Sequence, residues 1–471
     1  MATVLRVVDL GARSLWLDEA ASSMLARSDW HTFWSALLQR QANMAFYYLL
    51  LREWIRIPFS FAATDAGLRL LSVILGVAAV LLAYKIMLAT SGARAAWIAS
   101  FLLAINAFHI QYSQEARGYA LVVFLTLASC WLFLSLLRQP KASAGLQAGY
   151  ILVSVLMIYA HLFGMWIVLA QLAAVLVMRS RTRTVVCMDA AIILVFALPL
   201  VVSLALVSDR SQLSWMNPSS APSFYAVLVE FSGGGLLLIV FAALLLFSLR
   251  GYWRMPQAQR PSPAVVYAFL WMWLLLPIVI VGIVSLYRPA LQARYLIVSL
   301  PAFLLLAADG LARIRSKVIS IVTVVAITGF STVGLNSYYR ARVDVNHSDN
   351  WRDATAYCLS HARPGDAVLF TYSAEEIPFR VYQGRLVGME VGLTLLPQRT
   401  ELELLNAAGT WTTAAEAADA ASRYRRVWVV TALQPSGASL QAHAALRKVA
   451  REESRRDFGF VRVQEFVGAG L

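Results

Sequence analysis

The sequence predicts a polytopic α-helical membrane protein that carries a small α/β domain at its C-terminal end. Of its 471 residues, 59% are hydrophobic and only 14% are charged, and the mean hydropathy is +0.65. A soluble domain of this length could not bury so much apolar surface, because surface area falls too slowly with size. Apolar segments long enough to cross the hydrocarbon core of a membrane recur along the chain. After about residue 338 the composition becomes polar, which marks the second domain.

About ten apolar segments are predicted to span the membrane. They are Leu68–Ala89, Ala95–Ile110, Tyr119–Leu137, Leu146–Ala160, Phe163–Met178, Val185–Val207, Gly234–Leu249, Ala264–Tyr287, Tyr295–Ala312 and Lys317–Leu335. The run from Leu146 to Met178 is too long for one crossing. We therefore divide it at His161.

Basic residues occupy alternate connectors between these segments. They are Arg94; Arg138 and Lys141; Arg179, Arg181 and Arg183; Arg250, Arg254 and Arg260; and Arg313, Arg315 and Lys317. With ten crossings these connectors share one side, which the positive-inside rule identifies as cytoplasmic. Much of the net charge of +14 is then a topology signal, so nucleic-acid binding is disfavoured. The same parity places residues 9–66, 109–117, 208–232 and 288–294, and the chain after about residue 340, on the extracytoplasmic face.

The long first outer segment begins almost at Met1, without a full span ahead of it. Either the chain is translocated with its N-terminus first, or a further helix precedes Met1. We expect the further helix.

The first outer segment combines an adjacent pair of acids with an aromatic stripe. On a helix the side chains of Asp18 and Glu19 would diverge by about 100°, so they would not both face one point. One carboxylate could act while the other caps or supports the helix; the alternative is a solvated turn. The stripe has helical spacing and predicts a helix that lies in the membrane interface. It consists of Trp30, Phe33, Trp34, Leu37 and Leu38, with His31, Ser35 and Gln39 on the opposite face.

The connector between the second and third segments holds more polar residues than a short turn needs. These residues are Asn106, His109, Gln111, Tyr112, Gln114, Glu115, Arg117 and Tyr119. Ionisable groups at membrane depth are costly and usually functional, although a Glu115–Arg117 pair that neutralises itself is the alternative. Arg288 and Arg294 add cations on the outer face, where a lipid phosphate is a suitable anionic partner. His161 alone is equally consistent with a buried, hydrogen-bonded histidine.

Five short motifs in a fixed order resemble the GT-C superfamily of glycosyltransferases. They are Ser14-Leu-Trp-Leu-Asp18-Glu19-Ala, Asn43-Met-Ala-Phe-Tyr47-Tyr48-Leu-Leu-Leu, Arg69-Leu-Leu-Ser72, Tyr112-Ser-Gln-Glu115-Ala-Arg117-Gly-Tyr119 and Arg294-Tyr295-Leu-Ile. The chain looks most like the bacterial glycosyltransferase family 39 type, which is similar to the protein mannosyltransferases and the lipid A aminoarabinose transferases. The resemblance covers residues 10–375 and rests on the order of the motifs, since no single motif is specific.

The resemblance implies an inverting glycosyltransferase that moves a sugar from a polyprenyl-phosphate donor to an acceptor hydroxyl at the extracytoplasmic face. Asp18 matches the family's first acidic position and would be the general base, beside Glu19. Glu115 matches the second acidic position. The departing phosphate gains charge and needs cations, for which Arg117 and Arg294 are the candidates. His109 and His161 are further phosphate-binding candidates, and the residues expected to line the substrate are Tyr47, Tyr48, Tyr112, Tyr119 and Tyr295.

The chain departs from the family pattern ahead of its two adjacent tyrosines. Many relatives carry an acid and a pair of prolines there, whereas this chain has Gln41-Ala-Asn43-Met44-Ala45. We therefore expect no metal at this loop and no cofactor. The expected partners are the donor lipid, the surrounding membrane lipid and an acceptor that is a protein, a lipid or a glycan.

Residues 1–337 are predicted to form the membrane-embedded catalytic domain, with 9–66 as its first outer loop, and residues 338–471 an extracytoplasmic α/β domain. Helix and strand patterns alternate in the C-terminal part, which predicts a small α/β sandwich with a partly parallel sheet. The expected elements are helices at Trp351–His361, Thr412–Tyr424 and Leu440–Arg451, and strands at Ala367–Tyr372, Val427–Thr431 and Phe458–Phe466. The C-terminal part lacks a glycine-rich phosphate loop and metal-spaced Cys or His residues. We therefore expect it to bind or shield the acceptor.

The main alternative is a transporter or flippase of lipid-linked sugars. Such a protein places polar residues in the middle of the membrane on broken helices, often in inverted repeats. The predicted segments are instead unbroken, and the polar clusters lie at one face. A membrane anchor for the C-terminal domain would need only one or two crossings. An enzyme of the cell's inner (plasma) membrane, with its active face outside, is therefore favoured.

Overall fold

The computed structural model describes residues 1–58, 60–139, 143–176, 181–207, 221–253, 261–287, 291–343, 349–386, 392–406, 409–432 and 437–468. The chain divides into two compact units. Unit 1 comprises Met1–Val8, Ala42–Tyr47 and Arg69–Ser337, and unit 2 comprises Asp9–Gln41, Tyr48–Leu68 and Tyr338–Leu471. The first outer loop is therefore divided, and most of it packs with the C-terminal residues.

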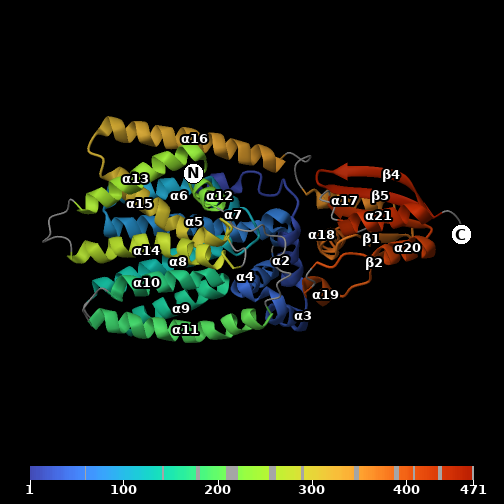
Figure 1. The fold of residues 1–471 in the computed structure, drawn as a ribbon, viewed down its shortest axis with the longest axis horizontal. Coiled ribbons are helices and arrows are strands. Elements are labelled where there is room, and N and C mark those ends of the chain that lie inside the picture. The colour runs from blue at the N-terminus through green and yellow to red at the C-terminus, as the bar shows by residue number, and fades with distance from the viewer. Residues whose placement is uncertain are drawn as a thin grey trace. The chain divides into compact units, whose positions relative to one another are not determined.

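Unit 1 is a bundle of long apolar helices (Figure 1). Its helices are α1 (Ala2–Val7), α5 (Asp65–Thr90), α6 (Ala93–Ile105), α7 (Ala107–Ser113), α8 (Tyr119–Arg138), α9 (Ala144–Ala160), α10 (Met165–Leu176), α11 (Arg181–Val207), α12 (Ala221–Ser232), α13 (Gly235–Trp253), α14 (Pro261–Val284), α15 (Leu300–Ala312) and α16 (Lys317–Val343), with short 3-10 helices η4 (Leu162–Gly164) and η7 (Tyr295–Ser299). The first residues of α5 and the last of α16 belong to unit 2.

Each of the ten predicted spans corresponds to a helix or to a bent pair of helices. Within the described residues, six helices are long and apolar enough to cross a membrane, and two bent pairs pass the same test when each is joined. The remaining two predicted spans are shorter apolar helices, Ala144–Ala160 and Leu162–Leu176. The prediction of a polytopic membrane protein is therefore confirmed.

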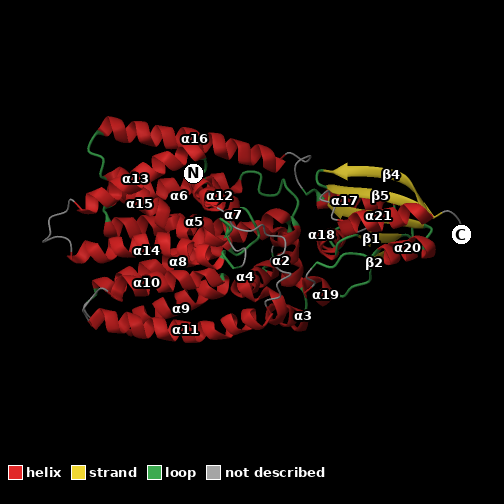
Figure 2. Ribbon diagram, in the orientation of Figure 1, coloured by secondary structure: helices red, strands yellow, loops and turns green. Residues whose placement is uncertain are grey.

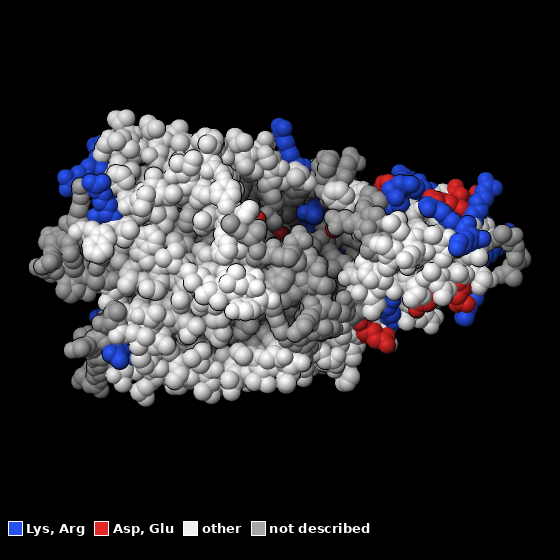
Figure 3. Space-filling view, in the orientation of Figure 1, with Lys and Arg blue, Asp and Glu red and all other residues white. Residues whose placement is uncertain are grey.

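The basic connectors meet at one end of the bundle. Arg94 Nη2 donates to the carbonyl oxygen of Ile314 at 3.2 Å and to Ser320 Oγ at 2.9 Å. At another connector, Arg138 Nη2 donates to the carbonyl oxygen of Ala89 at 2.6 Å. Figure 3 shows lysine and arginine side chains gathered at this end of the helices. Of the predicted connector residues, those at 141, 179, 254 and 260 lie outside the described residues, as does the predicted outer-face arginine at 288.

Helices α13 and α15 approach closely through Gly310. A Cβ atom added at this residue would overlap the backbone carbonyl of Leu244. The span Tyr295–Ala312, which contains α15, is also the most enclosed, with 89% of its residues buried, against 11% for the most apolar stretch of α16. Its packing therefore depends on a small residue, as is common where helices meet inside membranes.

We expect Gly310→Ala to lower the thermal stability of the detergent-solubilised protein, because the backbones of α13 and α15 must move apart. Overpacking of this kind costs about 1–3 kcal/mol. The matched control is Gly329→Ala in α16, where no atom lies within 4 Å of the added Cβ. The control should melt at or above the wild-type temperature, since alanine is the better helix former. Equal melting of the two variants by fluorescence-detected size-exclusion chromatography would contradict the close approach.

One predicted span is broken, and a second bend lies just ahead of the predicted span Gly234–Leu249, after the helix α12 in the predicted outer connector; the sequence interpretation missed both bends. The segment Ala95–Ile110 bends by 61° at Asn106, whose side chain caps α7 by accepting a hydrogen bond from His109 N at 2.9 Å. A bend of 83° separates α12 from α13 at Gly233 and Gly234, whose φ angles of 85° and 156° favour glycine. Hydropathy averaged over a span does not register one capping residue or a Gly-Gly pair. The predicted division at His161, by contrast, is confirmed by the end of α9 and the start of η4.

Unit 2 combines the helices of the first outer loop with an α/β region. The loop helices are α2 (Leu17–Arg27), α3 (Trp30–Ala36) and α4 (Ala45–Arg56, which begins in unit 1), with a 3-10 helix η3 (Ser60–Ala63). The C-terminal elements are α17 (Trp351–His361), β1 (Ala367–Phe370), η9 (Ser373–Glu375), α18 (Glu376–Gln383), β2 (Thr394–Leu396), α19 (Glu401–Asn406), α20 (Ala414–Arg423), β3 (Arg426–Ala432), α21 (Gly437–Val449), β4 (Ala450–Phe458) and β5 (Val461–Gly468).

The C-terminal sheet has five strands in the order β2-β1-β3-β5-β4 (Figure 2). Strands β2, β1 and β3 pair in parallel, and β5 is antiparallel to both of its neighbours, β3 and β4. The predicted partly parallel sheet is therefore confirmed. Alternate side chains of β3 serve its two faces: Val427 and Val429 pack with the core under α20 and α21, whereas the Trp428 ring contacts Tyr357 of α17.

The sequence interpretation missed β4, β2, α18 and α19. The segment Ala450–Phe458 contains six charged residues, and its first two were assigned to a helix. In the structure it is an edge strand paired with β5 alone. Charged side chains suit an edge strand, since they protect its unpaired backbone groups from other chains. The sequence interpretation therefore missed this strand because its residues are mostly charged. In the structure, pairing with β5 stabilises it.

Candidate functional site

An aromatic and cationic cluster lies in unit 1 beside the helix breaks. The rings of Tyr112 and Tyr119 are 4.8 Å apart between centroids. His161 joins them, with its ring centroid 6.2 Å from that of Tyr119 and 5.9 Å from that of Tyr295. The end of α7, the start of α8, the break after α9 and η7 thus contribute to one cluster. Four of the predicted site residues therefore lie together, although they come from separate parts of the sequence.

Two arginines belong to this cluster. The guanidinium carbon of Arg294 is 5.4 Å from the centroid of the Tyr295 ring. Arg117 and Arg294 are both close enough to His161 to interact with it electrostatically. His161 is buried, its Nδ1 accepts from Phe163 N at 3.2 Å, and its Nε2 has no hydrogen-bond partner among the described residues. Two cationic side chains and one imidazole N–H therefore lie in the same cluster.

Three of the five sequence motifs meet near the backbone of Arg117. Tyr47 Oη and Ser72 Oγ are 3.5 Å apart, and Ser72 Oγ also lies 3.5 Å from the carbonyl oxygen of Arg117. Asn43 Oδ1 accepts from Leu162 N at 3.0 Å, which ties the second motif to the His161 break. These contacts position the arginine-bearing connector against α4 and α5.

Glu115 is half-buried in the same connector. Its Oε1 accepts from Gln111 Nε2 at 3.5 Å, and it interacts electrostatically with Tyr112. A nearby carboxylate that the sequence interpretation did not single out is Glu230 of α12, which interacts with Arg294. An acid near the end of an otherwise apolar helix is the feature that could have identified it.

His109 has a different environment. It is fully buried, and Arg6 Nη2 lies 2.7 Å from its Nδ1. Arg6 also donates to the carbonyl oxygens of Leu103 and Ala104, at 3.1 Å and 3.0 Å. A guanidinium can only donate, so Nδ1 of His109 accepts, and a phosphate would find only the opposite N–H. The phosphate-binding role of His109 stays a prediction, and Arg6, which holds it, was missed because it is far away in the sequence.

Asp18 and Glu19 lie on the first turn of α2 in unit 2. Glu19 is buried, and its Oε2 accepts from Trp16 N at 3.4 Å, which caps the helix. Asp18 is half-buried, and its carbonyl oxygen accepts from Ser22 Oγ at 2.8 Å. The two acids therefore have different environments, and the Glu19 carboxylate caps the start of α2. Tyr48 is buried in α4 of the same unit.

The aromatic stripe of α3 is divided between two environments. Phe33 and Leu37 are buried, whereas Trp30, Trp34 and Leu38 are 43%, 49% and 68% exposed. The guanidinium carbon of Arg52 lies 4.0 Å from the Trp30 ring centroid. An exposed tryptophan pair next to an arginine suits a membrane interface, which remains our prediction for this helix.

A buried polar cluster around Glu375 stabilises the C-terminal sheet. Glu375 is buried where β1 and β3 end, and it accepts from Tyr372 N at 3.0 Å and Ala432 N at 2.8 Å. Two threonine hydroxyls, of residues 371 and 431, also approach it. Burial raises its pKa to about 7, and these hydrogen bonds oppose the shift. Within the described residues, no group of three or more His, Cys, Asp or Glu could hold a metal ion.

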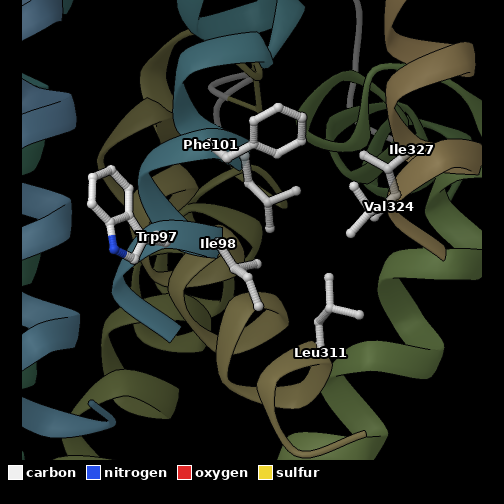
Figure 4. Close-up of a pocket in the computed structure, with 7 residues that line it drawn as sticks. Trp97, Ile98, Phe101, Leu311, Val324 and Ile327 are labelled. Atoms are coloured by element: carbon white, nitrogen blue, oxygen red, sulfur yellow. The ribbon is translucent and has the colours of Figure 1, made fainter. Parts of the chain in front are cut away.

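Helices α6, α15 and α16 enclose a groove of about 200 Å³ in unit 1 (Figure 4). It is lined by Trp97, Ile98, Phe101, Leu102, Leu311, Val324 and Ile327. Every lining side chain is apolar, and none belongs to the cluster around His161. The groove therefore lacks the groups that acid–base catalysis or phosphate binding requires.

No protein-family model matches the chain, and no curated protein matches it. Solved structures do share its fold. The crystal structure of ArnT from Cupriavidus metallidurans in the apo state has a TM-score of 0.66 at 13% sequence identity, covering 98% of this chain and 96% of that one. With undecaprenyl phosphate bound to ArnT, the TM-score is 0.64.

Two further structures match more loosely. The Archaeoglobus fulgidus oligosaccharyltransferase complex with Zn and sulfate has a TM-score of 0.54 at 13% identity, over 96% of this chain and 71% of that one. The arabinofuranosyltransferase AftD from Mycobacteria also has a TM-score of 0.54 at 13% identity, over 100% of this chain and 40% of that one. The predicted fold is thus confirmed, since these solved structures share it.

Proposed function

We propose that this multi-pass membrane protein is a glycosyltransferase that moves a sugar from a polyprenyl-phosphate donor to an acceptor hydroxyl. The observation that carries the proposal is the convergence of Arg117, Arg294 and His161 among tyrosine rings in unit 1. Two guanidiniums with an adjacent N–H donor suit a phosphate, because guanidinium and phosphate form charge-assisted hydrogen bonds. The undecaprenyl phosphate bound to ArnT, a protein of the same fold, supports this choice of ligand.

The chemistry proposed is a single displacement at the anomeric carbon. The acceptor hydroxyl oxygen forms the new bond, the bond to the phosphate oxygen breaks, and the configuration inverts. Asp18 takes the proton of the hydroxyl as the bond forms. Arg117 and Arg294 stabilise the charge that grows on the departing phosphate. The tyrosines at positions 47, 48, 112, 119 and 295 line the substrate, and no metal takes part.

The location proposed is the inner membrane, with the active face and the C-terminal region outside the cytoplasm. The basic connectors lie at one end of the helices, and the positive-inside rule assigns such an end to the cytoplasm. Along the sequence, the helix breaks that carry the cluster around His161 alternate with those basic connectors. This arrangement supports a site that meets lipid-linked sugars after they have crossed the membrane.

A flippase of lipid-linked sugars is the second candidate, because the two bent helix pairs are a feature of transporters. The bends adjoin each other: Asn106 Nδ2 donates to the carbonyl oxygen of Phe231 at 2.8 Å, just before the Gly233 turn. Both breaks therefore border one region of the bundle. We favour the enzyme because Arg117, Arg294 and His161 lie close together and suit a phosphate.

The test is turnover by the purified chain. The protein in detergent is incubated with a panel of undecaprenyl-phosphate-linked hexoses and pentoses and with membrane extracts as acceptor. Release of undecaprenyl phosphate is followed by liquid chromatography and mass spectrometry. We expect release from at least one donor. No release from any donor, together with movement of a labelled donor across liposomes that contain the protein, would favour the flippase instead.

A further inference from the structure

A buried carboxylate in unit 2 connects the first outer loop to the C-terminal helices. Asp65 is only 6% exposed and stands at the first residue of α5. It accepts from Arg352 Nη2 at 2.5 Å and from Tyr382 Oη at 2.8 Å, and Arg385 Nη1 forms an ion pair with its other oxygen. Arg352, Tyr382 and Arg385 come from α17, α18 and the residues that follow α18. A carboxylate buried in this way is retained only when its partners are in place.

The Tyr382 hydroxyl makes a second contact, with the chain just before α2. Its oxygen accepts a hydrogen bond from Leu15 N at 2.6 Å while its proton goes to Asp65. Burial, followed by the Asp65 charge, raises the pKa of Tyr382, so the phenol keeps the proton that it donates. Leu15 is fully buried, and Asp18 follows it by less than one helical turn. One phenol therefore links Asp65 to the start of the helix that carries the proposed base.

Further contacts hold the same segment. Ser14 Oγ accepts from Trp351 N at 3.2 Å, and Arg352 Nη2 donates to the carbonyl oxygen of Gly11 at 3.0 Å. On α2 itself, Arg385 Nη2 lies 3.4 Å from Ser23 Oγ. The segment before α2 is thus held by side chains and backbone groups of the C-terminal region, through contacts that a solvated loop would not need.

We infer that Tyr382 is a positioning residue: together with Asp65 and Arg385 it sets the start of α2 and so the direction of the Asp18 carboxylate. The inference rests on the proposed function. It also gives the C-terminal region a role in the reaction, which is to orient the base. Misplacement of a catalytic group by about 1 Å can lower turnover by roughly a hundredfold.

The test is Tyr382→Phe in the full-length protein, assayed with the undecaprenyl-phosphate donor that turns over. We expect kcat to fall about 10- to 100-fold, with KM for the donor changed less than about twofold. The control is Tyr357→Phe, since the hydroxyl of Tyr357 makes no hydrogen bond among the described residues. In an Asp18→Asn background, Tyr382→Phe should lower the residual turnover less than about twofold, because both changes act through one carboxylate.

Hydrogen exchange supplies a measurement that does not depend on turnover. The amides of residues 15–20 should exchange at least about tenfold faster in Tyr382→Phe than in Tyr357→Phe. Unchanged exchange, or an unchanged kcat with faster exchange, would overturn the inference. If Tyr382→Phe does not fold, Arg385→Lys replaces it; we expect a lower kcat at constant KM, and an unchanged kcat counts against the inference. Full activity of Asp18→Asn would instead defeat the assignment of the base in the proposed function.

Discussion

Replacing Asp18 by asparagine is expected to remove most of the sugar transfer while leaving expression and folding intact. The amide keeps the size of the side chain but cannot take a proton from the acceptor hydroxyl. Loss of a positioned general base costs a factor of about 10²–10⁴ in rate. Because Asp18 is half-buried at the first turn of α2 and its neighbour caps the helix, the exchange should leave the fold unchanged.

The measurement is release of undecaprenyl phosphate from the donor by purified wild type and variant at equal concentrations. Glu53→Gln is the matched control, because Glu53 is exposed on α4 in the same unit and pairs with Arg56 at the surface. It should retain full turnover. Glu19→Gln should chiefly lower stability, since it weakens the cap on Trp16 N. Unchanged turnover in Asp18→Asn would remove Asp18 from the mechanism.

Much of the fold followed from local properties of the sequence. A membrane span is encoded by the apolar character of its own residues, so all ten predicted segments correspond to helices. The break at His161 was predictable because the apolar run around it exceeds one crossing. The bends at Asn106 and Gly233 were not, since each depends on one or two residues whose effect appears only in backbone conformation.

The contacts that organise the site are long-range, and no local pattern encodes them. The pairing of Arg6 with His109 and of Asp65 with Tyr382 joins residues that are far apart in the chain. In the sequence Asp65 is an ordinary acid before an apolar helix. Its burial among cations becomes evident only when the C-terminal helices are in place. Local patterns could thus identify Tyr112, Tyr119 and their neighbours as candidate site residues. They could not identify the distant residues that position the site.

Arg294→Ala is expected to weaken binding of undecaprenyl phosphate about 10- to 100-fold with little loss of stability. Charge-assisted hydrogen bonds contribute about 1.5–3 kcal/mol, and every 1.4 kcal/mol is tenfold in affinity. Arg294→Lys should recover only part of the affinity, because an ammonium lacks the planar fork of the guanidinium. The remaining cation, Arg117, accounts for the binding that survives, and Glu230 loses the arginine with which it interacts.

Affinity is measured by native mass spectrometry of the detergent-solubilised protein titrated with undecaprenyl phosphate. The matched control is Arg183→Ala, which removes the same charge from an exposed residue of α11 at the basic end of the bundle. A general loss of attraction between a cationic protein and an anionic lipid would weaken both variants equally. If Arg117, Arg294 and His161 form a phosphate site, only Arg294→Ala should weaken the binding of undecaprenyl phosphate. Equal affinities of the two variants would therefore exclude Arg294 from the site and leave the cluster around His161 a structural feature of the helix breaks.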